Sequence, residues 1–531
     1  MPGGHSQTLR PFLWRAERLY PDTEIVSRTH EGRTRHTYAE YADRTAQLAN
    51  ALDEYGIERG DRVATFCWNH TRHFETYFGV PNTGAQLHTI NPLLPDEHIR
   101  FIVEDAADEI VFVDPSLAPK LASAAGGDEG EADGAPEFDG VDFVVMGSSE
   151  TDALDATPYE EFIADRSTEY DWPDLDGDRP AGLCYTSGTT GKPKGVEYTQ
   201  SMLWSHTMAS QTPQGIPMED SDVVMPVVPM FHVNAWELPY ATTMAGAKQV
   251  HPGPSPDAAD LVELIETEGV TLTTGVPTVW LNVLDYLDEH DADVSSLERI
   301  VVGGSAAPEA MMRRYEEAYG VTVDHAWGMT ETMSIGSVSR PKSWMDDWGR
   351  DERFEKRRRQ GLLSPGLEMR VVGDDGEEVA WDGETLGELH VRGPTVASEY
   401  FERPDANEAD FEDGWLKTGD IVSVDSDGYL AVADRTKDII KSGGEWISSI
   451  RLENELMAHA DVVEAAVVAV DDERWGERPH AYVVGRDEAS VTAAALLDAL
   501  ADEFPRWWLP DEVTFVDELP KTATGKLDKK R

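Results

Sequence analysis

The stretch YTSGTTGKPKGV, residues 185–196, combines residue types that hold phosphate. Its glycines allow close approach of the backbone to an anion, its hydroxyls offer donors, and Lys192 and Lys194 offer positive charge. The spacing differs from the G-x-x-x-x-G-K-[ST] loop of many nucleotide hydrolases, because Gly188 and Gly191 are three residues apart. A linker has a similar content of glycine and threonine, but the two lysines and the preceding apolar run favour a phosphate site.

The rarity of lysine strengthens this interpretation. The 531 residues include 13 lysines and 32 arginines against 101 acidic residues, a formal net charge of −56. An acidic surface of this kind is typical of proteins in concentrated salt, because at about 1 M ionic strength the Debye length is about 3 Å. We therefore expect a halophilic, archaeal source. The 15 Trp, 16 Tyr and 15 Phe argue against a disordered chain.

Six further motifs carry polar or charged residues at turns. Each motif taken alone also has a purely structural explanation, since a glutamate after threonine often caps a helix and a glycine pair often makes a turn. Nine of the 13 lysines nevertheless fall within these motifs and the stretch 185–196, which a solvated surface does not explain. The motifs are GGSAAP (303–308), WGMTET (327–332), GWLKTGD (414–420), DRTKD (434–438), KSGGEWISS (441–449) and PKTATGKLDKK (520–530).

The elements that must position these motifs alternate between helix and strand from about residue 39 to 330. Helical periodicity at 261–269 is followed by a β-rich run at 270–276 and by a helix with Pro277 in its first turn. This alternation predicts α/β layers with mostly parallel strands. The acidic, glycine-rich segment 124–140 is predicted to be an exposed loop.

Beyond about residue 366 the pattern changes to short strands with tight turns, which predicts a β subdomain. After DRTKDIIK, helical and β-rich runs predict a small α+β domain.

Cys67 and Cys184 are too few to cross-link the fold or bind a metal, and no apolar run is suitable as a signal peptide or a membrane span. We expect a soluble cytoplasmic protein.

Together, the motifs resemble those of the adenylate-forming superfamily, which includes acyl-CoA synthetases, luciferases and the adenylation domains of peptide synthetases. The resemblance implies a large domain of layered α/β sheets at 1–434, with its β subdomain at about 366–434. It further implies a hinge at 435–441, with Lys437 as its pivot, and a small mobile α+β domain at 442–531.

The resemblance also implies a site for ATP, with Mg²⁺ held by Glu331 and Thr186 and phosphate contacted by Thr330. Asp420 is expected to bind the ribose, Trp446 to stack on the nucleotide and Arg435 to support ribose or phosphate. The remaining expected nucleotide contacts are Ser187, Gly188, Thr189, Thr190, Gly191, Lys192, Lys194, Gly304, Ser305, His325, Ala326, Trp327 and Lys437.

Two lysines are expected to serve two half-reactions from opposite faces of the small domain. Lys526 resembles the lysine that stabilises developing charge while a carboxylate attacks the α-phosphate. Lys441 resembles the lysine on the face that serves thioester formation, and the neighbouring Ser442, Gly443 and Gly444 are expected to leave room for CoA. No protein nucleophile is needed, because the acyl-AMP is already activated.

The acid is expected to bind beside VVPMFHVNAWELPY, residues 227–240, although a core strand and turn would explain the same run. This segment most closely resembles that of medium- and long-chain fatty acyl-CoA synthetases, which implies that Val233, Trp236 and Gly303 line the acyl pocket. His232 is expected to shape its carboxylate end. Short, methylthio-alkanoic and aryl acids remain the nearest alternatives.

Two departures from the family pattern accompany this resemblance. Trp327 replaces a more common tyrosine, and the chain stops five residues after Lys526, where the resemblance implies a further short helix.

The rival functions are an adenylation unit that loads a carrier protein and a non-catalytic binder of nucleotide or acyl-adenylate. The expected partners are small molecules, not nucleic acid, and a homodimer is compatible with this interpretation.

Overall fold

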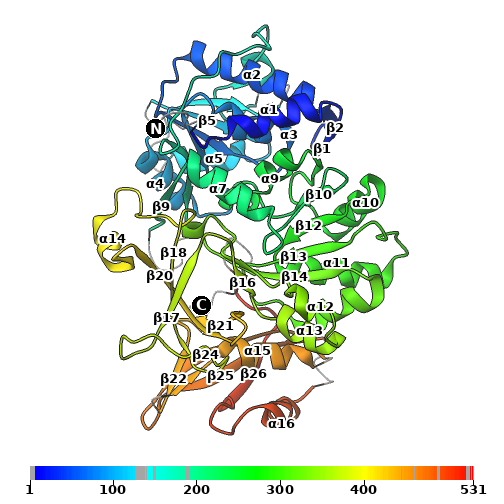
Figure 1. Cartoon of the computed structure of the whole chain (residues 1–531), viewed down its shortest axis with the longest axis vertical. Helices are drawn as coiled ribbons and strands as arrows, with labels where there is room; N and C mark the ends of the chain where they lie inside the picture. Colours follow the sequence, from blue (N-terminus) through cyan, green and yellow to red (C-terminus); the bar gives the residue numbers. More distant parts are fainter. Residues whose placement is uncertain are drawn as a thin grey trace.

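The computed structural model shows α/β layers in its upper half, a β subdomain and a small C-terminal domain (Figure 1). It describes residues 6–126, 138, 140–147, 151–186, 192–443, 445–459, 461–486, 491–521, 527 and 529. Seven residues of the expected site lie outside these ranges, namely Ser187, Gly188, Thr189, Thr190, Gly191, Gly444 and Lys526. The described residues confirm the mixed α/β fold with a smaller C-terminal domain.

A seven-stranded sheet has the order β7-β6-β5-β3-β4-β8-β9. Its strands are parallel except for the β8–β9 hairpin, which brackets the expected phosphate loop. The strands are β3 (Arg62–Phe66), β4 (Gln86–Thr89), β5 (Ile110–Val113), β6 (Asp142–Val145), β7 (Ala156–Pro158), β8 (Pro180–Tyr185) and β9 (Gly195–Thr199). The helices in this part of the chain are α2 (Tyr38–Tyr55), α3 (Thr71–Gly79), α4 (Asp96–Ala106), α5 (Ala118–Gly126) and α6 (Tyr159–Phe162).

A nine-stranded sheet has the order β16-β15-β14-β13-β12-β10-β11-β1-β2 and is parallel from β14 to β1. Its strands are β1 (Glu24–Thr29), β2 (Gly32–Thr37), β10 (Val223–Pro226), β11 (Lys248–His251), β12 (Leu272–Gly275), β13 (Arg299–Val302), β14 (Thr322–Trp327), β15 (Ser337–Val338) and β16 (Leu362–Leu363). The accompanying helices are α1 (Arg10–Leu19), α7 (Gln200–Ser210), α8 (Val233–Trp236), α9 (Leu238–Ala245), α10 (Ala258–Glu268), α11 (Pro277–Glu289), α12 (Glu309–Arg314), α13 (Arg350–Arg357), and the short turns η1 (Tyr315–Tyr319), η2 (Thr330–Thr332) and η3 (Ser343–Met345). The two sheets confirm the predicted parallel α/β layers.

Local sequence signals set the ends of these helices. Asp257 caps α10 by accepting from the backbone of Asp260, whose side chain in turn accepts from the backbone of Asp257. Gly269 ends the same helix with a φ of 70°, a conformation that glycine adopts without a Cβ penalty. Pro277 begins α11, as predicted, because the first helical residue needs no amide donor.

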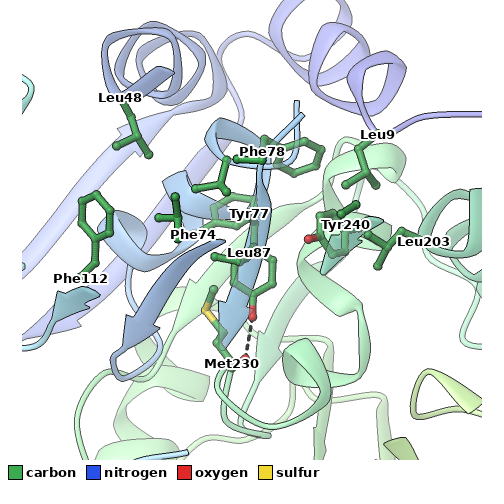
Figure 2. Close-up of a cluster of buried hydrophobic side chains, with 14 of the residues drawn as sticks. Leu9, Leu48, Phe74, Tyr77, Phe78, Leu87, Phe112, Leu203, Met230 and Tyr240 are labelled. Carbon is green, nitrogen blue, oxygen red and sulfur yellow. Dashed lines mark hydrogen bonds between the residues drawn. The ribbon is translucent and has the colours of Figure 1, made fainter. Parts of the chain in front are cut away.

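An extensive buried cluster joins strands of both sheets (Figure 2). Tyr77 of α3 packs beside Leu87 of β4 and Tyr240 of α9, and its hydroxyl donates to the carbonyl of Met230 at 2.7 Å. Burial of apolar side chains stabilises the fold by about 25 cal/mol per Å². Because Met230 lies two residues before His232, this core also fixes the start of the expected acyl segment.

The β subdomain is an antiparallel sheet of order β17-β18-β20-β19, with β21 paired to β20. Its elements are β17 (Glu368–Val372), β18 (Gly387–Arg392), α14 (Pro404–Asp410), β19 (Phe411–Glu412), β20 (Trp415–Val424) and β21 (Leu430–Arg435). These short strands and tight turns are those that the sequence predicts beyond residue 366.

The small domain follows residues 436–439 and packs two helices on a mixed sheet of order β23-β22-β25-β24, with β26 parallel to β25. Its elements are β22 (Ile440–Ser442), β23 (Glu445–Ile447), α15 (Ser449–Ala458), β24 (Val462–Asp472), β25 (Gly476–Gly485), α16 (Ala493–Glu503) and β26 (Glu512–Phe515). The exact domain and hinge boundaries remain predictions.

The expectation of an exposed loop over residues 124–140 was wrong at both ends. Ala124 and Ala125 complete α5 and are 1% and 7% exposed, while Phe138 is 5% exposed and packs near Phe143. These apolar side chains join the cluster on the adjacent sheet face, so burial overrides the polar composition of the segment. The residues at 127–137 and 139 lie outside the description.

Cys67 and Cys184 are both free and buried. No helix in the described ranges combines the length and the apolar character that crossing a membrane requires.

Candidate active site

A cavity of about 740 Å³ is lined by residues of β14 in the large body, β20 in the β subdomain and α15 in the small domain. It brings together residues that are far apart in the sequence. The expected site residues that line it are Thr186, Lys192, Lys194, His232, Val233, Trp236, Gly303, Gly304, Ser305, His325, Ala326, Trp327, Thr330, Glu331, Asp420, Arg435 and Lys437.

The ends of the phosphate loop are joined by main-chain hydrogen bonds. The amide of Thr186 donates to the carbonyl of Lys194 at 2.9 Å, and the Lys194 amide donates to Thr186 Oγ1 at 3.1 Å. The Lys194 ammonium lies 2.7 Å from Asp410 and 3.9 Å from the ring centroid of Tyr400, and the Lys192 ammonium lies 4.4 Å from that of Phe101. Cation–π contacts are worth about 0.5–2 kcal/mol, so a phosphate can replace them.

Glu331 is one of the buried carboxylates of the site. Its side chain accepts a hydrogen bond from the Tyr400 hydroxyl at 2.8 Å, and burial raises the pKa of Glu331 despite this bond and the nearby Lys194. A bound cation would offset that cost of burial. One carboxylate in the same cavity as Thr186 suits Mg²⁺, which takes one or two protein carboxylates and fills its shell with substrate phosphates and water.

Asp420 is held on both of its carboxylate oxygens. Trp327 Nε1 donates to Oδ2 and the Arg435 guanidinium pairs with Oδ1, both at 2.8 Å. The antiparallel pairing of β20 with β21 places Asp420 opposite Arg435. The indole at residue 327 therefore takes part in a polar contact of the site. Each carboxylate oxygen keeps a lone pair that a ribose hydroxyl can reach.

His325 lies on β14 and lines the cavity. Its Nδ1 faces the carbonyl of Arg358 at 3.0 Å, and its Nε2 faces the amide of Ala307 at 3.4 Å. Burial lowers the pKa of His325, so the ring is neutral near pH 7. Gly303 follows the adjacent strand β13 and leaves room for aromatic packing, because a Cβ built there would lie 3.1 Å from the ring of Trp236.

The segment 227–240 contains a buried left-handed turn and no strand, so of the alternative core strand and turn only the buried turn is present. The five residues 233–237 all have φ between 44° and 60°, including Val233 and Trp236, which line the cavity. Left-handed geometry costs about 1–2 kcal/mol per residue, so tertiary contacts must offset it. Asn234 supplies one such contact by donating to Glu237 Oε1 at 3.2 Å and accepting from Thr89 at 3.3 Å.

Glu237 is the buried residue that ends this turn. It is 1% exposed, and its Oε2 has no hydrogen-bond partner among the described residues. Burial raises the pKa of Glu237 well above its ordinary value, so folding favours the neutral acid. The folded state therefore binds one more proton than the unfolded state above about pH 4.3, and this group makes stability fall as pH rises.

Replacing Glu237 with glutamine is expected to remove that pH dependence while keeping the size of the side chain. The free energy of unfolding of Glu237→Gln relative to the wild type should rise between pH 5 and pH 8, by up to about 1.4 kcal/mol per pH unit. The Tm of the variant relative to the wild type should rise with it. Thermal unfolding of both proteins at pH 5, 6.5 and 8 in molar KCl measures the difference. A constant difference across the three pH values would show that Glu237 is ionised in the folded protein.

A second cavity of about 280 Å³ holds the expected thioester-forming face. It is lined by Lys441 and Trp446, with the Lys441 ammonium 5.9 Å from the ring centroid of Trp446. Gly443 donates to the carbonyl of Trp475 at 2.7 Å, and the adjacent Ser442 is buried. Lys441, Ser442 and Gly443 do not line the larger cavity.

Trp446, which was expected to stack on the nucleotide, lines the second cavity and does not line the larger one in this structure. The β22–β23 pairing places Trp446 opposite Lys441, and its ring packs on the cluster of Ile421, Ala433 and Ile439. Residues near the end of the chain approach the larger cavity instead, because Leu527 lines it. Lys526 precedes Leu527 but lies outside the described residues.

Sequence reasoning missed several side chains that complete the cavity. Tyr400, Asp410 and Gln360 line it, and Gln360 lies 3.4 Å from His325 Nε2 while accepting from the amide of Val432. None of the three belongs to a recognisable motif, so no sequence signal marks them. The carboxylates that surround Lys529 were also missed, although the rarity of lysine in this chain was a usable signal.

The layered α/β body, the β subdomain and the small C-terminal domain around this cavity form the fold of adenylate-forming enzymes. The AMP-binding enzyme family model matches residues 13–401, and the model of its C-terminal domain matches residues 451–526. The chain belongs to the AMP-binding enzyme family.

Similar proteins extend over nearly the whole chain. A long-chain fatty acid–CoA ligase of Thermus thermophilus is 43% identical over 522 residues, covering 98% of this chain and 94% of the relative. A medium-chain fatty acid–CoA ligase of Ectopseudomonas oleovorans is 40% identical (97% and 93% covered), and a 3-methylmercaptopropionyl-CoA ligase of Ruegeria lacuscaerulensis is 41% identical (97% and 95%).

Solved structures match the fold over both domains. An anthranilate CoA ligase in complex with anthranoyl-AMP superposes with a TM-score of 0.87 at 25% identity, covering 99% of this chain and 96% of the other. O-succinylbenzoate coenzyme A synthetase of Bacillus subtilis, in complex with ATP and a magnesium ion, gives a TM-score of 0.78 at 26% identity, with 98% of each chain covered.

Proposed function

We propose that this protein joins a medium- or long-chain fatty acid to CoA, using ATP and forming an acyl-AMP intermediate. One observation carries the proposal: a single cavity is lined both by the charged residues Lys192, Lys194 and Glu331 and by the apolar residues Val233 and Trp236. That arrangement suits a nucleotide triphosphate next to an apolar acid. The identity of 40–43% to medium- and long-chain fatty acid–CoA ligases supports the choice of acid.

In the first half-reaction, an oxygen of the fatty carboxylate attacks the α-phosphorus of ATP, and the bond to pyrophosphate breaks. Lys192, Lys194 and Thr186 hold the departing phosphates, and Lys526 stabilises the charge that develops at the α-phosphate. Glu331 and Thr186 would hold Mg²⁺, which neutralises negative charge on the phosphates when bound. The products are acyl-AMP and pyrophosphate.

In the second half-reaction, the sulfur of CoA attacks the acyl carbonyl and AMP leaves with the bonding electrons. The proton of the thiol is lost to solvent. The small domain turns about Lys437 so that the face with Lys441, Ser442 and Gly443 reaches the cavity, which is consistent with their separation from it here.

A second candidate is ligation of a short methylthio-alkanoic or aryl acid. The ring of Trp236 is 7% exposed and lies against Gly303, which narrows the apolar side of the cavity in this structure. The similarity to a 3-methylmercaptopropionyl-CoA ligase points the same way. Because each buried CH₂ is worth about 0.8 kcal/mol, a few side chains can change the preferred chain length.

An acid panel tests this proposal. AMP release should depend on both CoA and acid in molar KCl with Mg²⁺, and kcat/KM should be highest for a saturated acid of medium or long chain. A maximum at 3-methylthiopropionate or benzoate would favour the second candidate. No AMP release with any acid would favour a protein that binds nucleotide or acyl-adenylate without catalysis.

We further propose that the enzyme works in the cytoplasm of a cell with concentrated salt, where the net charge of −56 is screened. Its Tm should therefore rise between 0.1 M and 3 M KCl. Since molar KCl reduces the Debye length to about 3 Å, most of this rise is expected by about 1 M. Differential scanning fluorimetry across the KCl series measures it, and a flat or falling Tm would contradict the proposed salt adaptation.

A further inference from the structure

A buried cluster of charged side chains lies beside the nucleotide cavity, and neither half-reaction as described above uses it. Lys529 is 14% exposed at its side chain, and its ammonium lies 2.6 Å from Glu453 Oε1 on α15. The same ammonium donates to Ser449 Oγ, and Glu453 also accepts from the amide of Val467 at 2.7 Å. Both Lys529 and Glu453 line the cavity.

The cluster extends across the expected hinge through Asp434. This residue lies near the end of β21 and is 2% exposed, and its Oδ2 accepts from the amide of Ser449 at 2.8 Å and from its hydroxyl at 2.5 Å. Burial raises the pKa of Asp434, and the nearby charge of Lys529 opposes that rise. Asp434 precedes the hinge residues 435–441, whereas Ser449 follows them.

One lysine thus joins three separate parts of the chain. Lys529 comes from the last residues, Glu453 from the small domain and Asp434 from the strand that ends the β subdomain. Two residues before Lys529, Leu527 lines the nucleotide cavity and makes an isolated β-bridge with Lys521, which lines it too. The ion pair therefore fixes the terminal segment beside the cavity.

We propose that Lys529 is a positioning residue for the first half-reaction, acting through Glu453 and Asp434 and not on the substrate. The inference rests on the proposed function. Rotation about residues 435–441 would separate Asp434 from Ser449, so the complete cluster exists only in the orientation seen here. In that orientation the face with Lys441 lies away from the nucleotide cavity.

A second lysine–glutamate ion pair, outside the nucleotide cavity, serves as a control. It distinguishes a positioning role in the reaction from a general contribution to stability. Lys248 pairs with the buried Glu268 at 3.0 Å, and its side chain is 20% exposed, close to the 14% of Lys529. This pair lies on β11 and α10 and does not line the nucleotide cavity. Its loss is expected to lower stability without favouring either half-reaction.

The test compares Lys529→Met, Lys529→Arg and Lys248→Met in the full chain in molar KCl. Three quantities are measured: fatty-acid-dependent ATP/pyrophosphate exchange, thioester formation from supplied acyl-AMP, and Tm. Lys529→Met should slow exchange about tenfold or more while thioester formation stays within about threefold of the wild type. Lys529→Arg should restore exchange to within about threefold, and Lys248→Met should leave the ratio of the two rates unchanged.

An equal loss of both half-reactions in Lys529→Met, or no loss of exchange, would overturn the inference. If Lys529→Met does not fold, Asp434→Asn must show the same selective fall in exchange, and an unchanged ratio in that variant would overturn it. A wild type inactive in both half-reactions would overturn the proposed function as well. If the wild type is active in both half-reactions and Lys529→Met has the same two rates, the positioning role alone is overturned.

Discussion

Lys526→Ala should lose fatty-acid-dependent ATP/pyrophosphate exchange by a factor of about 10²–10³, or about 2.7–4 kcal/mol of transition-state stabilisation. The expectation rests on a positive charge that meets the α-phosphate only as negative charge develops there. The described neighbour Leu527 lines the nucleotide cavity, which supports this location for the segment. Exchange is measured with saturating fatty acid and ATP and without CoA.

Lys120→Ala is the control for this variant. Lys120 lies on α5 outside both cavities, so its loss should change exchange by less than about twofold. Thioester formation from supplied acyl-AMP should also remain close to the wild-type rate in Lys526→Ala. Exchange at a near wild-type rate in Lys526→Ala would remove this lysine from the first half-reaction.

Lys441→Ala should have the opposite effect and slow thioester formation about tenfold to a hundredfold, a change of about 1.4–2.7 kcal/mol. Its exchange rate should stay within about threefold of the wild type. The reason is spatial, because Lys441 lies in the second cavity beside Trp446 and does not line the nucleotide cavity. Rapid-quench measurement of acyl-AMP consumption by CoA reads the second step directly.

The two variants together test the assignment of the two faces. If Lys441→Ala and Lys526→Ala lose both half-reactions in equal proportion, the small domain does not present separate faces to the cavity. The Lys120→Ala variant again supplies the baseline.

The fold followed from local patterns because those patterns are strong in this chain. The β-rich run before Pro277 became β12, and Pro277 itself begins α11, since proline is favoured where a helix needs no amide donor. The motifs containing Gly304, Asp420 and Glu331 converge on one cavity, because strand ends of the large sheet and the β subdomain meet there.

The acyl segment was less predictable because its conformation opposes local preference. Residues 233–237 adopt left-handed geometry, which L-amino acids avoid unless tertiary contacts offset the cost. The contacts that do so, such as the Asn234–Thr89 hydrogen bond, join residues far apart in the sequence. The position of Trp446 in the second cavity could not be predicted for a related reason: a motif states which residues are present but not which face of a mobile domain meets the cavity.

The hydrogen-bond and ion-pair partners of the site residues could also not be predicted from the sequence. Tyr400 donates to Glu331 and Lys529 pairs with Glu453, yet the two residues of each pair lie far apart in the sequence, 69 positions for Tyr400 and Glu331. Such pairings depend on how β20, β21 and α15 pack. In a chain with 13 lysines, the retention of Lys529 was the one available signal.

The central claim is that this protein activates a fatty acid as its adenylate before CoA takes part. Incorporation of labelled pyrophosphate into ATP, measured in molar KCl with Mg²⁺ and without CoA, tests it most directly. The account predicts incorporation that requires a medium- or long-chain fatty acid and is absent without one. Incorporation that is independent of acid, or absent with every acid while Tm shows a folded protein, would contradict the account.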